Sequence, residues 1–293
     1  MILEVEIAQE YTGQQIDLCY LLPMWREILD FDTYAAGEGS TVQKIVDGSV
    51  YGQHLCGMAA VINTGNDFNW TGNDLAAANT YGYGRMAMNP SEDSAVIAKE
   101  WAELTLPKSL SDGVVSMLMK SWPTYEKYTS PLGIGWMVTP HEHYGPSIDG
   151  YEYSRWGTYH RADHLGLGVD RSHNGTGYAQ QYYEPNASMY DDPATCPEEL
   201  LLFFHHMPYT WKLASGKTLL QHIYDTHFEG VEEVREMITM WESLKEKIPE
   251  ESYTLVRERF ERQLANAREW RDQVNSYFYR KSGIPDEKGR KIY

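Results

Sequence analysis

Glutamates open the chain at a spacing that is suited to chemistry. In MILEVEIAQEY, Glu4, Glu6 and Glu10 fall on one side of an alternating pattern whose other side is apolar. Strict alternation predicts a strand over residues 1–10 with two different faces. In an ordinary half-solvated sheet, hydrogen bonds would simply hold Glu10 in place. At the end of a strand in a (β/α) barrel with a polar interior, Glu10 would stand where proton transfer takes place. The pattern alone leaves both interpretations open.

A second group of residues is suited to binding. Asn66 and Trp70 belong to the polar stretch NDFNWTG, which follows an apolar run of strand character. They would sit at the mouth of a barrel, or they would belong to an ordinary loop that caps the next helix. Trp156 and Arg161 lie in a long aromatic region. An indole can stack on a sugar ring and a guanidinium can bind an anion, although packing and ion pairing explain both residues as well.

Histidines raise the hypothesis of a metal-dependent hydrolase. The chain has no HExxH motif or other close helical ligand pair, and two adjacent histidines would point to different faces of a helix. A hydrogen-bonded loop scaffold is therefore favoured over a metal site, and no cofactor is expected. The histidines concerned are His141, His143, His160, His164, His205 and His206.

The first third of the sequence predicts the elements that position Glu10. Residues 1–88 read as a strand at 1–10, a helix at 23–31, an apolar strand at 55–65 and a helix at 73–88. The order β, α, β, α predicts parallel strands with helical crossovers. The near-continuous apolar character of the second strand predicts burial on both faces.

The remainder, residues 89–293, reads as helices and long loops with no clear strand. Residues 128–195 are rich in Gly, Tyr, His, Trp and Pro, and an ordered loop region of this length is usually functional. The predicted fold class is α/β plus all-α, with domains at 1–88 and 89–293. Helices are expected at 95–104, 114–122, 197–207, 217–228, 231–248 and 251–279.

The last expected helix carries an apolar stripe. It faces either the core of its own domain or a dimer seam, and the spacing does not decide between them. Its members are Leu255, Val256, Phe260, Leu264, Trp270, Val274 and Phe278.

Composition narrows the function classes. A net charge of −17 argues against nucleic acid and against an anionic membrane surface as partners. No run approaches the roughly 20 apolar residues of a membrane span, and no secretory signal is visible, so a cytoplasmic location is expected. Three scattered cysteines suggest free thiols. The aromatic residues, 22 Tyr and 9 Trp against 7 Phe, suit sugar stacking as well as an aromatic core.

Long irregular strings in the sequence resemble the α-glucuronidases of glycoside hydrolase family 67. The resemblance covers essentially the whole chain. The strings that carry it include EIAQEYTGQQ, PMWREILDFDTY, GNDFNWTG, WPTYEKYTSPLGIGWM, HYGPSIDGYEYSRWGTYHRADHLGLGVDR, GTGYAQQYY, CPEELLLFFHHMPY and SGKTLLQHIYDTHFEGVEEV.

The resemblance implies a fold, an activity and partners. The family has an N-terminal β domain, a central (β/α)8 barrel and a C-terminal helical domain. It removes glucuronic acid or its 4-O-methyl ether from glucuronoxylan-derived oligosaccharides, with inversion and without a metal. Its members tend to be homodimers that associate through the helical domain. On that plan, residues 1–88 are the last two β/α units of the barrel, and the chain is a C-terminal fragment.

By its QEY motif, Glu10 matches the family glutamate that activates the catalytic water as general base. Asn66, Trp70, Trp156 and Arg161 are then expected to bind substrate. The general acid, a second carboxylate and the basic residues that hold the uronate lie upstream in the family plan. The fragment alone is therefore expected to be inactive. The alternative is a non-catalytic module for dimerisation or carbohydrate binding.

Overall fold

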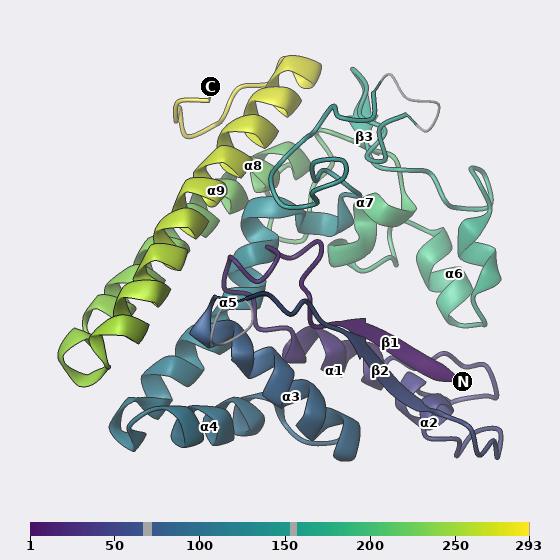
Figure 1. The fold of residues 1–293 in the computed structure, drawn as a ribbon. Coiled ribbons are helices and arrows are strands. Elements are labelled where there is room, and N and C mark those ends of the chain that lie inside the picture. The colour runs from purple at the N-terminus through teal and green to yellow at the C-terminus, as the bar shows by residue number, and fades with distance from the viewer. Residues whose placement is uncertain (67–71, 153–156, 293) are drawn as a thin grey trace. The chain divides into compact units, whose positions relative to one another are not determined.

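The computed structural model describes residues 1–66, 72–152 and 157–292, which are rich in helices and contain few strands (Figure 1). The chain divides into two compact units. The first comprises Met1–Tyr125 and Glu233–Leu264, and the second comprises Glu126–Glu232 and Ala265–Tyr293. The helix-rich character predicted for the larger part of the chain is confirmed.

A parallel pair of strands, β1 (Ile2–Glu6) and β2 (Gly57–Val61), lies in the first unit. Between them the chain forms α1 (Leu22–Asp30) and the short α2 (Val42–Val46). The predicted parallel arrangement with a helical crossover is thus confirmed. Register places Ile2 opposite Gly57 and Glu6 opposite Val61.

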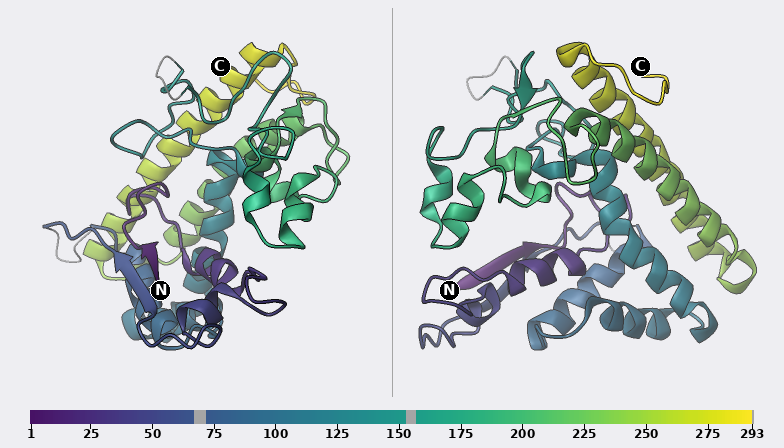
Figure 2. Two further views of the ribbon diagram at one scale, coloured as in Figure 1. Left: turned by 90° about the vertical axis from the view of Figure 1, so that its right-hand side faces the viewer. Right: turned by 180° about the vertical axis from the view of Figure 1, so that it is seen from behind.

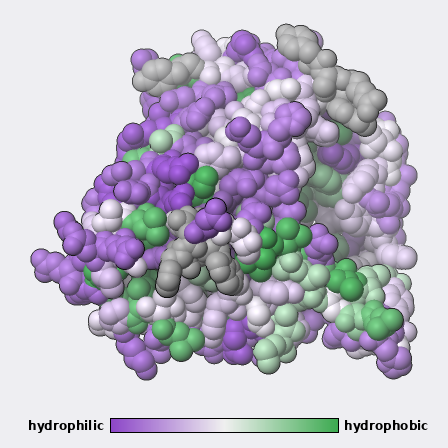
Figure 3. Space-filling view, in the orientation of Figure 1, coloured by the Kyte–Doolittle hydropathy of each residue, from purple (hydrophilic) through white to green (hydrophobic). Residues whose placement is uncertain are grey.

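Both strands are shorter than predicted, and the burial expected for the second strand is wrong. β1 ends at Glu6 rather than at residue 10, and β2 is half-buried with Val61 exposed. The reason is that each strand has one neighbour, so the described sheet has two open edges. Three apolar side chains at its start are exposed: Met1, Ile2 and Leu55. Figure 3 shows a hydrophobic patch at its lower right, the side on which Figure 1 marks the N-terminus.

Helices pack around the pair in the first unit. A 3-10 turn (Asp74–Ala76) leads into α3 (Ala77–Met88). Asp93 caps α4 (Ser94–Thr105) by accepting hydrogen bonds from two backbone amides, as an N-cap aspartate does. α5 follows at Ser111–Thr129. The helices predicted at 23–31, 73–88, 95–104 and 114–122 are all confirmed.

Between residues 130 and 218, the second unit consists largely of loops and short elements. The strands and α-helices described there are β3 (Gly166–Leu167), α6 (Asn186–Asp191), α7 (Leu201–Phe204) and β4 (Met207–Pro208). β3 and β4 form an antiparallel pair, so the expectation that no strand follows residue 88 is wrong in this one place. The helix predicted at 197–207 is reduced to a 3-10 turn and α7.

Two long helices end the chain, and they lie side by side (Figure 2). α8 (Leu219–Glu242) runs through Gly230 as a single helix, although the sequence predicts two. α9 spans Glu250–Ser282. Most of its apolar stripe is buried within the chain, which identifies the stripe as core rather than as a dimer seam: Val256, Phe260, Trp270, Val274 and Phe278.

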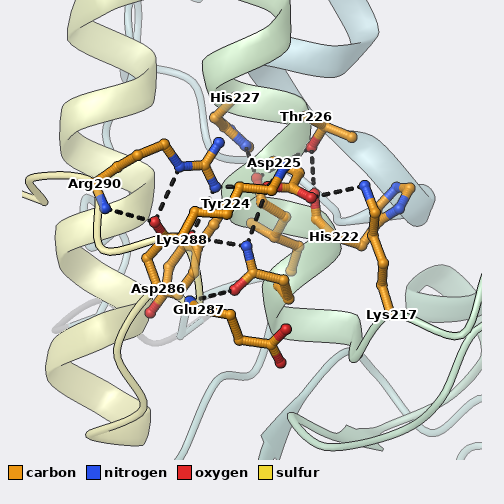
Figure 4. A network of polar contacts seen from close by, with 12 residues as sticks. Lys217, His222, Tyr224, Asp225, Thr226, His227, Asp286, Glu287, Lys288 and Arg290 are labelled. Carbon is orange, nitrogen blue, oxygen red and sulfur yellow. Dashed lines mark hydrogen bonds and ion pairs between the residues drawn. The ribbon is translucent and has the colours of Figure 1, made fainter.

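An ionic network holds the C-terminal tail to α8 (Figure 4). The side chain of Asp225 is 1% exposed, and one of its oxygens lies 2.6 Å from Arg290 and 2.9 Å from Lys288. The other oxygen lies 2.7 Å from Lys217. Asp286 accepts three hydrogen bonds from Arg290, one of them at 2.7 Å. Buried carboxylates of this kind are stable only when charged partners surround them.

None of the described helices is long and apolar enough to cross a membrane.

Candidate active site

Glu10 lies in a turn just beyond the carboxyl end of β1. The amide of Ala8 still donates to the carbonyl of Val61 at 3.1 Å, which extends the strand pairing by one bond. Gln9 then takes a left-handed conformation, with φ at 56°, and ends the extended backbone. The prediction that Glu10 is the last residue of an alternating strand is therefore wrong. It is half-buried at the edge where parallel strands present their carboxyl ends.

Hydrogen bonds from a glutamine of the turn hold its backbone in place. Gln14 donates from its backbone to the carbonyl of Gln9 at 2.8 Å and from its side chain to the carbonyl of Glu10 at 2.8 Å. Gln14 and Gln15 are left-handed as well, with φ at 53° and 59°. Non-glycine residues adopt this conformation at an energetic cost, and such strain concentrates at functional sites.

Buried amide side chains form hydrogen bonds with the backbone of residues 12–21, which follow Glu10. Gln9 is 1% exposed, and its Nε2 donates to the carbonyls of Thr12 at 2.7 Å and Asp17 at 3.2 Å. Asn79 of α3 donates to the carbonyl of Cys19 at 2.9 Å, and its Oδ1 accepts from the amide of Leu21 at 2.9 Å. Buried backbone outside a sheet needs such partners, because no neighbouring strand forms hydrogen bonds with its N–H and C=O groups.

Two further side chains complete this support. Gln263 of α9 both donates to and accepts from the backbone of Leu18, at 3.1 and 3.0 Å. Ser121 of α5 accepts from the amide of Tyr20 at 2.8 Å. Sequence inspection did not single out Gln9, Asn79, Ser121 or Gln263. For Asn79, Ser121 and Gln263, the available signal was a lone polar residue on an otherwise apolar face of a helix.

The other candidates differ in how they are placed. Asn66 is exposed and follows the end of β2, so it lies beyond the same edge of the parallel pair as Glu10. Arg161 belongs to the second unit, where it is exposed and left-handed with φ at 49°. Trp70 and Trp156 lie outside the described residues.

The thiols do not fit a nucleophilic role. All three cysteines are free, as predicted. Burial, and then the nearby Asp17, raise the pKa of Cys19 well above its ordinary value. Burial, and then Glu199, raise the pKa of Cys196 to about 12. Both thiols therefore stay protonated at neutral pH, whereas a nucleophilic cysteine must be a thiolate.

Two histidines, the buried His160 and the half-buried His206, hold loops through hydrogen bonds to backbone carbonyls. His160 contacts the carbonyl of Ile148 at 2.7 Å, and His206 contacts that of Gly168 at 2.9 Å. Burial is the main cause that lowers the pKa of His160, so its ring stays neutral near pH 7. Among the described residues, no group of three or more His, Cys, Asp or Glu side chains could hold a metal ion.

Family models match almost the entire chain. The model described as "Glycosyl hydrolase family 67 C-terminus" matches residues 71–291, and the one described as "Glycosyl hydrolase family 67 middle domain" matches residues 1–70. The chain belongs to glycosyl hydrolase family 67. Glu10 thus lies in the part that matches the middle domain of family 67. The domain boundary predicted at 88/89 stays a prediction.

Curated relatives within family 67 are similar over nearly the whole chain. A probable alpha-glucuronidase A of Aspergillus oryzae is 43% identical over 99% of it, and the alpha-glucuronidase A of Emericella nidulans is 43% identical over 98%. That of Aspergillus tubingensis is 42% identical over 98%. The chain spans about a third of the length of these relatives, 34–35%.

Proposed function

We propose that this chain is the C-terminal part of a xylan-degrading α-glucuronidase and supplies Glu10 as its general base. The observation that carries the proposal is the position of Glu10. It lies beyond the carboxyl end of a parallel strand, in a turn that has left-handed residues and is held by hydrogen bonds. The chain is 43% identical to a probable alpha-glucuronidase A. The reaction is the inverting hydrolysis of α-1,2-linked glucuronic acid, or its 4-O-methyl ether, from xylooligosaccharides.

Residues 1–88 would form the last two β/α units of a (β/α)8 barrel. Three features support this: the parallel pairing of β1 and β2, the helical connection between them, and the helix α3 that follows β2. The open strand edges fit the same interpretation, because a barrel gives every strand two neighbours. Active sites of such barrels lie at the carboxyl ends of the strands.

Inversion assigns a specific task to Glu10. One carboxylate removes a proton from water, whose oxygen then bonds to the anomeric carbon as the glycosidic bond breaks. A carboxylic acid on the other side, about 6.5–9.5 Å away, protonates the leaving oxygen. In this proposal the acid, a second carboxylate and the cations that hold the uronate come from the upstream part of the enzyme. The isolated chain is then inactive.

Substrate-binding roles for Asn66, Trp70, Trp156 and Arg161 belong to the same proposal. Asn66 has the most direct support, since it follows β2 at the edge that carries Glu10. A homodimer formed through the helical part is likewise proposed, with contacts other than the buried stripe of α9. The alternative function is a non-catalytic dimerisation or carbohydrate-binding module, and the exposed rings of Trp136 and Tyr159 in the second unit favour it.

A chimera tests the catalytic role directly. The matching part of the Emericella nidulans α-glucuronidase A is replaced by this chain, and release of glucuronic acid from aldouronic oligosaccharides is measured. Glu10→Gln should lower kcat by about 10²–10⁴-fold, the usual contribution of one proton-transfer group. Glu258→Gln is the matched control, because Glu258 is exposed on α9, away from the strands, and its loss should leave kcat nearly unchanged.

Two results would contradict the proposal. Undiminished turnover by the Glu10→Gln chimera would remove Glu10 from the reaction. Turnover by the isolated 293-residue chain would show that it contains its own acid.

A further inference from the structure

Four aromatic side chains gather on the loops of the second unit and define an aromatic platform: Trp136, His143, Tyr151 and Tyr159. The rings of Trp136 and Tyr159 lie 5.8 Å apart between centroids, tilted by 44°. His143 meets Trp136 edge-on at 6.0 Å, and Tyr151 meets Tyr159 edge-on at 5.3 Å. The four rings thus form one connected surface feature.

Two of these rings are open to solvent. Trp136 is 40% exposed and Tyr159 is 37% exposed, whereas Tyr128, Tyr224 and Trp270 of the same unit are fully buried. Two rings exposed to this degree offer on the order of 150 Å². A protein interface needs roughly 800 Å² from each partner. The exposed part of the platform therefore fits one or two sugar rings far better than a protein surface.

The platform is held in place before any ligand arrives. Trp136 and His143 both have left-handed backbones, with φ at 50° and 55°. Residues other than glycine keep this conformation only where their surroundings impose it, and they cluster at binding sites. The indole of Trp136 also donates to the hydroxyl of Tyr151 at 3.4 Å. Rings fixed in this way lose little conformational entropy when a ligand stacks on them.

We propose that the aromatic platform binds a neutral pyranose oligosaccharide, the unsubstituted xylose backbone of the substrate. The choice of sugar rests on the function proposed above. Stacking uses the apolar face of a pyranose against an aromatic ring and requires no charge. A net charge of −17 disfavours polyanionic ligands.

Binding of xylohexaose to the purified 293-residue chain tests this site by titration calorimetry. Xylohexaose carries no uronic acid, so the measurement does not depend on catalysis. Trp136→Ala should weaken binding at least about tenfold, and Tyr159→Ala by about three- to tenfold. Trp136→Phe should retain most of the affinity, since a ring remains. Tyr183→Ala is the matched control, because Tyr183 is 57% exposed in the same unit but outside the platform.

Circular dichroism of each variant verifies that it is folded. The proposal is overturned if the folded wild-type chain does not bind xylohexaose, or if the two alanine variants bind it as well as wild type. It is also overturned if these variants lower the oligomeric mass measured by light scattering but bind xylohexaose as wild type does. The platform would then be a contact between protein chains. An inactive chimera that still binds xylohexaose would contradict the catalytic proposal and leave the platform standing.

Discussion

The side chain of Asn79 has three partners in the buried support of the Glu10 turn. It bonds to the carbonyl of Cys19, to the amide of Leu21 and, at 3.4 Å, to the side chain of Gln9. Asn79→Ala would leave these groups buried without a partner. We expect the free energy of unfolding to fall by about 2–4 kcal/mol, since each such group costs about 1–3 kcal/mol. Urea denaturation followed by tryptophan fluorescence measures the change.

Asn63→Ala is the control for this prediction. Asn63 is exposed in the same unit, and surface substitutions usually change stability by less than about 0.5 kcal/mol. Equal effects of the two substitutions would show that Asn79 does not support the turn.

The sequence predicted the importance of some residues of the candidate site but not of others. Glu10 was found because it belongs to a recognisable motif and follows a strand in which apolar residues alternate with glutamates. The left-handed backbone of Gln9 was not found, because glutamine does not signal this conformation as glycine does. Asn79 and Gln263 were missed because a single amide in a helix is usually solvated. Only the tertiary fold shows which unpaired backbone it meets.

At the scale of elements, α1 and α3 meet at a glycine. A Cβ added at Gly82 of α3 would lie 2.4–2.5 Å from the methyl carbons of Leu22. Gly82→Ala should therefore destabilise the chain by about 1–3 kcal/mol, the usual cost of overpacking. Gly84→Ala in the same helix has open space around it and should stabilise the chain by about 0.5–1 kcal/mol, through higher helix propensity. Thermal unfolding of both variants should give shifts of opposite sign.

The C-terminal tail is the second element with a testable interaction. Burial alone would raise the pKa of Asp225, but hydrogen bonds from Lys217, Lys288, Arg290 and Gln221 outweigh it and hold the pKa far below the usual range. Burial acts on Asp286 in the same sense. There, hydrogen bonds from Arg290 and Gln221 lower the pKa to about 2. Both carboxylates are thus stabilised in their charged form by the folded chain.

Acid should therefore release the tail. A carboxylate with a depressed pKa contributes stability that is complete above its unfolded pKa and is lost as the pH falls through the folded value. For Asp286 the interval runs from about pH 4 down to about pH 2 and is worth about 2 kcal/mol. Asp225→Asn should cost about 1.5–3 kcal/mol at neutral pH, because Lys217, Lys288 and Arg290 lose the carboxylate that they share. It should also flatten this acid dependence.

Urea midpoints measured across this pH range provide the check. Asp112→Asn is the control, because the Asp112 side chain is 87% exposed and its loss should leave the acid dependence unchanged. A flat profile in the wild-type chain would rule out the network as a source of acid sensitivity.

Helices with a long apolar periodicity were predicted well. The length and burial of elements that depend on neighbouring strands or helices were predicted poorly. The amphipathic patterns of α1, α4 and α9 located those helices from the sequence. α8 was predicted as two helices because Gly230 suggests a break, yet the glycine is buried within a continuous helix. The burial expected of β2 failed because it depends on neighbouring strands, which an apolar run cannot supply by itself.

At the scale of the whole molecule, the open sheet is the feature that governs association. Ile2 is 66% exposed and Leu55 is 90% exposed, and the amino group of Met1 donates to the carbonyl of Leu55, so these side chains form one apolar surface at the start of β1. Unpaired strand edges beside such a surface favour contact with another chain. The isolated chain should therefore self-associate through its sheet at micromolar concentrations, despite its net charge of −17.

Ile2→Lys combined with Leu55→Lys should suppress this association, because lysines beside a strand edge oppose pairing. Sedimentation velocity over a series of concentrations measures the change. Leu104→Lys is the matched control, since Leu104 is 74% exposed in the same unit but lies on α4, away from the sheet. If the double variant associates as strongly as wild type, contacts outside the sheet are responsible, which would favour a dimer formed by the helical part. If only the double variant dissociates, the open sheet is the surface through which the chain associates.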